Sequence, residues 1–195
     1  MKFLYAMLTI SLLAAPAAAS PVWYSATLSG AAENPPNASP GTGTAMVGYD
    51  AATHMLKVKV SFSGLTGGTT ASHIHCCTAA PMSGNAGVAT EVPTFSGFPL
   101  GVTSGTYDEM FDLTLAASFN PAFVTAQGSV AAAEMALAAG LASGTAYLNI
   151  HTADHPTGEI RGFLTPASSN VPEPATLALI GAGLLGVWRL RRKAA

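Results

Sequence analysis

The chain has 195 residues, of which 49% are hydrophobic, 9% charged and 8% aromatic. This composition is too apolar and too weakly charged for an intrinsically disordered polypeptide. The 20 glycines and 13 prolines exceed the usual combined share of about 12%. They favour many short strands joined by turns over a mainly helical protein.

The amino-terminal end, residues 1–19, has the order of a secretory signal peptide. Lys2 precedes an apolar run from Phe3 to Leu13, and Ala17-Ala18-Ala19 supplies a cleavage site of small residues. We therefore expect cleavage after Ala19 and export of the rest of the chain.

Between residues 22 and 165 the sequence is typical of strands separated by turns. Strict alternation of apolar and polar residues over 55–63 predicts an antiparallel strand with one face in solvent. Weaker segments of the same kind are 22–28, 43–49, 71–75, 106–115, 145–151 and 159–165. An all-β domain is the expected fold class.

One stretch, residues 118–143, departs from the strand pattern. Asn120-Pro121 is typical of a helix N-cap followed by proline at the first helical position, and residues 130–141 are rich in alanine. We expect a short helical turn near Pro121 and a helix of about three turns that ends at Gly140 or Gly144.

The domain without its two ends is acidic. Residues 21–170 contain three cationic and nine acidic side chains, a net charge of −6. Too few cations remain to neutralise a phosphate backbone, so nucleic-acid binding is not expected. Arg161 is the only arginine in this range, and we expect it to pair with a carboxylate such as that of Glu33.

Three histidines are candidate metal ligands. His73 and His75 are two residues apart in a predicted strand, so their side chains project from one face about 6.6 Å apart along the chain. His151 ends another predicted strand and can join them only if the two strands lie side by side or opposite each other. Three imidazole nitrogens suit copper or zinc. In the alternative interpretation, these imidazoles only hydrogen-bond to backbone and carboxylate groups beneath the loops.

Cys76 and Cys77 follow directly and are the only cysteines in the chain. After export they meet an oxidising compartment. Three states are open to them: a vicinal disulfide, a dithiol that holds a soft metal ion, or an intermolecular bridge. We expect the vicinal disulfide, as a rigid turn after the strand of His73.

The carboxy-terminal end combines a proline-rich motif, an apolar run and a basic cluster. Pro172-Glu173-Pro174 precedes an uncharged run over 175–188, and Arg191-Arg192-Lys193 lies in the basic end. As a helix the run would span only about 21 Å. The basic cluster nevertheless predicts a short transmembrane stop-transfer helix with its positive end in the cytoplasm.

The order of these features resembles the PEP-CTERM sorting signal of Gram-negative bacteria over residues 171–193. The resemblance implies transient anchoring in the inner membrane and cleavage near Pro172-Glu173-Pro174 by an exosortase. It also implies delivery to the cell surface or extracellular matrix of cells that produce exopolysaccharide.

Five motifs in order carry a second resemblance: residues 24–30, 33–36, 72–75, 147–152 and 158–162. Together they resemble the CHRD domain, named after chordin. The resemblance covers 22–165 and implies an antiparallel β-sandwich of immunoglobulin-like or superoxide-dismutase-like type, usually extracellular, with no established general activity. Cys76-Cys77 and the alanine-rich insertion depart from the common pattern, so the resemblance says nothing about them.

The chain therefore divides into a signal peptide (1–19), a CHRD domain (22–165), a linker (166–170) and a sorting segment (171–195). We expect a non-catalytic binding or structural component of the bacterial surface or matrix, without catalytic residues. The alternative is a copper- or zinc-binding protein that uses His73, His75 and His151. A superoxide-dismutase-like enzyme ranks third, because neither a bridging imidazole nor a zinc loop can be assigned. Expected partners are the exosortase, the inner membrane transiently, and exopolysaccharide or surface proteins.

Overall fold

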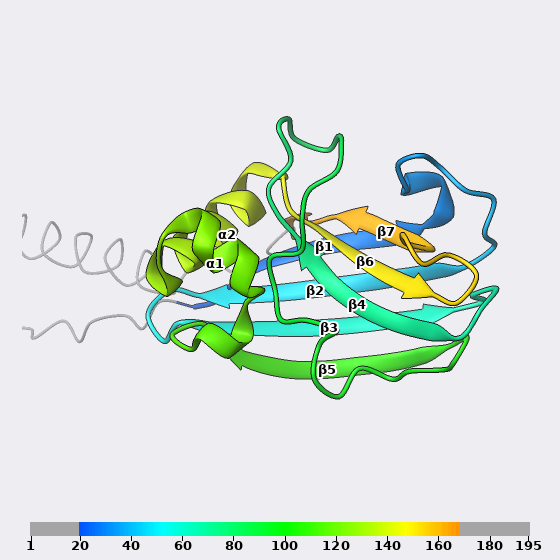
Figure 1. Cartoon of the computed structure of the whole chain (residues 1–195), viewed down its shortest axis with the longest axis horizontal. Coiled ribbons are helices and arrows are strands. Elements are labelled where there is room, and N and C mark those ends of the chain that lie inside the picture. Colours follow the sequence, from blue (N-terminus) through cyan, green and yellow to red (C-terminus); the bar gives the residue numbers. More distant parts are fainter. Residues whose placement is uncertain (1–19, 168–195) are drawn as a thin grey trace, which may run out of the picture.

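The computed structural model describes residues 20–167. Antiparallel strands form a curled sheet, and two short helices pack at one end of it (Figure 1). The predicted signal peptide, most of the linker, and the sorting segment with Pro172, Glu173 and Pro174 lie outside the described residues.

The strands make one hydrogen-bonded sheet. Its order is β4-β6-β7-β1-β2-β3-β5, with the short β8 beside β1. The strand bounds are β1 Val22–Ser29, β2 Thr42–Asp50, β3 Met55–Ser63, β4 Thr69–His75, β5 Gly105–Asp112, β6 Tyr147–Thr152, β7 Ile160–Phe163 and β8 Thr165–Pro166. The prediction of a mostly β domain is confirmed. The prediction of a sandwich of two packed sheets is not confirmed, because the strands form one sheet.

β3 shows why these residues form strands. Its apolar side chains, Leu56, Val58, Val60 and Phe62, are at most 3% exposed, while Lys59, Ser61 and Ser63 on the other face are exposed. Alternation with period two therefore places one face of the strand in the core and the other in solvent.

Two α-helices, α1 (Pro121–Gln127) and α2 (Val130–Ser143), occupy the predicted insertion. The Asn120 side chain accepts a hydrogen bond from the N–H of Ala122 and caps α1. Gly144, with φ of 69°, ends α2 in the left-handed conformation that glycine adopts without strain. The predicted helices are confirmed, with α1 longer than the single turn expected. Two 3-10 turns, Gly30–Ala32 and Ala116–Ser118, complete the elements.

Among residues 20–167, no single helix is long and apolar enough to cross a membrane. Within this described part of the chain, α1 and α2 reach that length and composition only when taken together, and their axes are bent by 93°. In α2 the side chains of Leu137 and Leu141 are fully buried.

Glu134 joins α2 to the turn between β2 and β3. Its carboxylate accepts a hydrogen bond of 2.8 Å from the Tyr49 hydroxyl and lies 2.9 Å from His54 Nδ1. The His54 side chain is 51% exposed, but its partner Glu134 is buried. The contact therefore connects the turn that carries His54 to α2.

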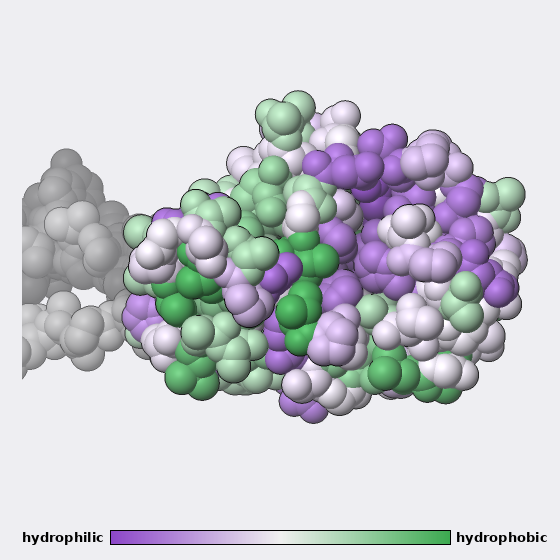
Figure 2. Space-filling model, viewed as in Figure 1, coloured by the Kyte–Doolittle hydropathy of each residue, from purple (hydrophilic) through white to green (hydrophobic). Residues whose placement is uncertain are grey.

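β4, β6 and β7 lie side by side and carry polar residues on one face. His73 of β4 is opposite Asn149 of β6, which in turn is opposite Arg161 of β7. The alternate residues Ile74, Leu148, Ile150 and Ile160 are fully buried in the core. Hydrophilic residues gather over β6 and β7 in Figure 2, whereas hydrophobic ones are more frequent over the helices.

Candidate metal centre

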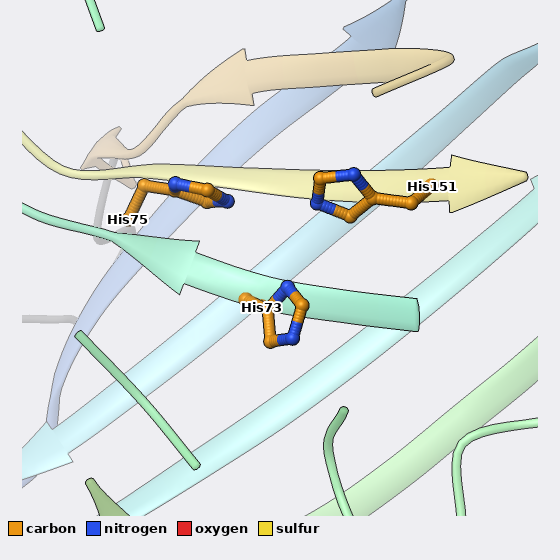
Figure 3. A group of neighbouring side chains, drawn as sticks. All are labelled: His73, His75 and His151. Carbon is orange, nitrogen blue, oxygen red and sulfur yellow. The ribbon is translucent and has the colours of Figure 1, made fainter. Parts of the chain in front are cut away.

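His73, His75 and His151 come together on the polar face of β4 and β6. Each ring offers one nitrogen within 4.8 Å of the nitrogens offered by the other two. Figure 3 shows the three rings grouped over the two strands, His73 and His75 from β4 and His151 from β6. The strand pairing that the sequence left open thus places all three histidines in one cluster.

One nitrogen of each ring is hydrogen-bonded to a backbone carbonyl. His73 Nε2 lies 2.6 Å from the oxygen of Pro93, His75 Nδ1 lies 2.9 Å from that of Ala86, and His151 Nδ1 lies 3.0 Å from that of Pro156. A carbonyl oxygen can only accept, so each of these nitrogens carries the proton and donates. Metal-binding histidines are commonly oriented in this way by a backbone carbonyl.

The second nitrogen of each ring is buried and has no hydrogen-bond partner within residues 20–167. These atoms are His73 Nδ1, His75 Nε2 and His151 Nε2. Each has a lone pair, because the proton is on the other nitrogen. A purely structural role accounts for the first nitrogen of each ring but leaves three buried acceptors unsatisfied, at a cost of about 1–3 kcal/mol each.

Burial keeps the three imidazoles neutral. It lowers the pKa of His73 and His151 below the ordinary value of 6.5, and it lowers the pKa of His75 to about 4. The carbonyl contacts oppose this effect but do not overcome it. Neutral imidazole is the form that binds a metal ion, so no proton has to be displaced near pH 7.

The spacing of the three nitrogens is compatible with a first-row transition metal after a shift of the rings. Zn–N bonds are about 2.0–2.1 Å long, so two nitrogens in a tetrahedral zinc site are about 3.4 Å apart. The nitrogens of the cluster lie within 4.8 Å of one another, so the rings would move closer together to hold one ion. A set of three imidazoles suits zinc or copper and lacks the oxygen ligands that calcium and magnesium require.

A disulfide joins Cys76 and Cys77 immediately after His75. The two sulfurs lie 3.8 and 3.5 Å from the carbonyl oxygen of Ala136 on α2. As a disulfide they provide no thiolate ligand, so the candidate ligands are the three nitrogens alone.

Arg161 and Glu33 form the expected ion pair, with 3.8 Å between Arg161 Nε and Glu33 Oε2. The Arg161 guanidinium also lies over the ring of Tyr147, 4.7 Å from its centroid, and Tyr147 stacks on His75 at 4.8 Å. Burial raises the pKa of Glu33 to about 7, although Arg161 acts in the opposite direction. Through the stacking of Tyr147 on His75, Arg161 and Tyr147 border the histidine cluster.

Sequence patterns alone could have found some of these neighbours. Tyr147, Asn149 and His151 alternate along one strand, so they share a face. The carbonyl groups of Pro93, Ala86 and Pro156 have no such signal, because the loops that carry them have no repeating pattern. His155 and His54 lie outside the cluster.

A curled antiparallel sheet with a largely buried histidine cluster on its polar face defines a mostly β domain with a candidate metal centre. The chain belongs to the CHRD domain family, whose pattern matches residues 24–164. A PEP-CTERM protein-sorting motif matches residues 170–193. Both resemblances drawn from the sequence are confirmed, and together they indicate an extracellular protein processed by exosortase-type machinery. No curated protein and no solved structure gives a significant match.

Proposed function

We propose that the protein is a non-catalytic metal-binding component of the cell surface, and that His73, His75 and His151 hold a copper or zinc ion. One observation carries this proposal. Each of the three rings has one buried nitrogen without a partner within residues 20–167, offers a nitrogen within 4.8 Å of the other two rings, and donates a hydrogen bond from its other nitrogen to the backbone. A single divalent ion would satisfy all three lone pairs at once.

The surroundings of the cluster support an ion that stays bound. His73 and His75 are 6% and 8% exposed and His151 is half-buried, which limits the surface for the exchange of substrates at the ion. The acidic domain also attracts cations in general. We therefore favour a protein that keeps the ion bound over an enzyme that uses the ion to convert a substrate.

A bound ion would also stabilise the loops around the site. The donated hydrogen bonds connect the ligand rings to Pro93 and Ala86, in the segment between β4 and β5, and to Pro156, before β7. The three ligands come together only in the folded chain, so the ion would bind the folded state and not the unfolded one. It should therefore raise the melting temperature.

The proposed setting is the outer surface. The tail would hold the exported protein transiently at the inner membrane until an exosortase cuts near Pro172-Glu173-Pro174. The mature domain would then act in the extracellular matrix or at the cell surface, next to exopolysaccharide or other surface proteins.

Elemental analysis of the exported protein tests the proposal. Untagged protein purified from the producing cells should carry one copper or zinc ion per chain. His151→Ala should lose the ion, and His155→Ala, which changes a histidine outside the cluster, should keep it. Equal metal content in the two variants, or none in the unaltered protein, would contradict the proposal.

A further inference from the structure

A second site lies beside the histidine cluster. A pocket of about 470 Å³ opens between the loop after β1 and the ends of β6 and β7. Its lining includes Glu33, Asn85, Tyr147, Asn149, Gly158 and Arg161. Its volume is in the usual range of about 300–1,000 Å³ for small-molecule sites. It lies in the region where hydrophilic residues gather over β6 and β7 (Figure 2).

Two residues that line this pocket each carry a buried oxygen atom with no hydrogen-bond partner within residues 20–167. The atoms are Glu33 Oε1 and Asn149 Oδ1, on side chains of residues that are 8% and 2% exposed. Within residues 20–167 the other buried side-chain atoms without a partner are the three histidine nitrogens. Buried polar groups in folded proteins are nearly always satisfied, so both oxygens point to a ligand that donates hydrogen bonds.

Arg161 supplies the opposite hydrogen-bonding capacity. Its Nε donates to the carbonyl of Ala32 at 2.6 Å, and its Nη1 donates to Asn85 Oδ1 at 2.7 Å. A guanidinium has five N–H donors, so further donors remain for a ligand in the pocket. The residue is only 4% exposed, which fixes the position of these donors.

Gly158 keeps the pocket open. A Cβ atom at this position would lie 2.5 Å from Asn149 Nδ2 and 2.8 Å from Glu33 Oε1. Both distances are too short for contact, so any side chain here would displace Asn149 and Glu33, which line the pocket. Gly158 also has φ of 132°, where other residues are strained.

The chemistry of the lining selects the class of ligand. Glu33 Oε1 and Asn149 Oδ1 can accept hydrogen bonds from a ligand, and Arg161 can donate them. A hydroxyl group both donates and accepts hydrogen bonds. Glu33 and Arg161 pair with each other, so neither of these two groups offers an unpaired charge to an anion or a cation. We propose that the pocket binds one neutral sugar residue of a carbohydrate, held by hydrogen bonds from its hydroxyl groups.

The ring of Tyr147 supports binding by hydrogen bonds rather than by ring stacking. His75 covers it at 4.8 Å, and the Arg161 guanidinium lies over it at 4.7 Å. The sugar is therefore expected to contact polar groups of the pocket, with discrimination set by hydroxyl orientation.

Nuclear magnetic resonance titration of the exported, isotope-labelled protein tests the inference. The probes are the methyl glycosides of glucose, galactose and mannose, with glucuronic acid and glucosamine as charged comparisons. At least one neutral glycoside should give saturable shifts of the side-chain amides of Asn85 and Asn149. No saturable shift with any neutral glycoside, or tighter binding of a charged sugar, would overturn the proposal.

Two variants separate the pocket from the rest of the fold. Asn149→Ala removes an amide that lines the pocket and should weaken binding about tenfold or more. Thr125→Ala, on the exposed surface of α1, should leave binding unchanged. Equal affinity in these variants, with equal melting temperatures, would overturn the assignment of Asn149. Binding should persist in the presence of a chelator, so the result does not depend on whether the histidines hold a metal ion.

Discussion

Gly140 of α2 lies directly against the sulfur of Cys76. A Cβ atom at residue 140 would overlap that sulfur and would lie 2.7 Å from the sulfur of Cys77. The absence of a side chain at Gly140 therefore lets the helix pack on the disulfide that follows the strand of His73 and His75.

We predict that Gly140→Ala destabilises the folded protein by about 1–3 kcal/mol, because the added methyl group overpacks this contact. Chemical unfolding of the oxidised protein measures the effect. In an ordinary helix interior the same change would stabilise by about 0.5–1 kcal/mol.

The matched control is Gly140→Ala in a chain that also carries Cys76→Ala and Cys77→Ala. Without the sulfurs the substitution should become neutral or stabilising, so the double-mutant cycle isolates the contact. An equal loss of stability in both backgrounds would show that the sulfurs are not the cause.

Glu134→Ala should destabilise the protein by about 1–3 kcal/mol, since it leaves the Tyr49 hydroxyl and His54 without their shared partner. The neighbouring Met135, which is 66% exposed, provides the control. Met135→Ala should change the free energy of unfolding by no more than about 0.5 kcal/mol. If urea unfolding shows similar small losses for both, the contact between α2 and the turn before β3 contributes little.

The pH dependence of stability should differ between the unaltered protein and Glu33→Gln. The folded-state pKa of Glu33 is about 7 and its ordinary value is 4.5, because burial favours the protonated carboxyl. The contribution of protonated Glu33 to the free energy of unfolding is therefore fully present below pH 4.5 and is lost as the pH rises through 7. Relative to Glu33→Gln, the unaltered protein should lose up to about 3 kcal/mol over this range.

Unfolding curves of the two metal-free proteins at several pH values measure this difference. The comparison cancels the buried histidines, whose lowered pKa values act in the opposite direction in both proteins. A constant difference between the two proteins across the range would mean that Glu33 has an ordinary pKa.

The sorting motif predicts a processed carboxy terminus. In cells with a matching exosortase, mass spectrometry of surface material should find mature protein that ends near Pro172-Glu173-Pro174. Surface protein that retains Arg191-Arg192-Lys193 would indicate a simple membrane anchor. Replacement of Pro172-Glu173-Pro174 by alanines should block processing and keep the chain with the membrane fraction.

Local patterns predicted most of the fold. The alternation over 55–63 matches β3, and Asn120-Pro121 marks the start of α1. The arrangement of strands was harder, because the pairing of β4 with β6 and of β7 with β1 joins segments far apart in the chain. One curled sheet and two packed sheets give the same alternation along each strand.

The candidate site could be predicted only in part, because local patterns do not reveal which distant strands pair. His73-Ile74-His75 fixes two side chains on one face, but only the register of β4 with β6 brings His151 to them. The carbonyl of Ala86 and the unsatisfied oxygen of Asn149 depend on how loops cover the sheet. Backbone groups in such loops have no signature in the residue types.

Calorimetric titration with Cu(II) and Zn(II) tests the central claim most directly. We expect the exported, metal-free protein to bind one of these ions with micromolar or tighter affinity. The double variant His73→Ala, His75→Ala should keep its strand content by circular dichroism and lose at least about a hundredfold in affinity, because two of three ligands are gone. Equal affinity in the two folded proteins would contradict the metal centre and return the three histidines to a structural role.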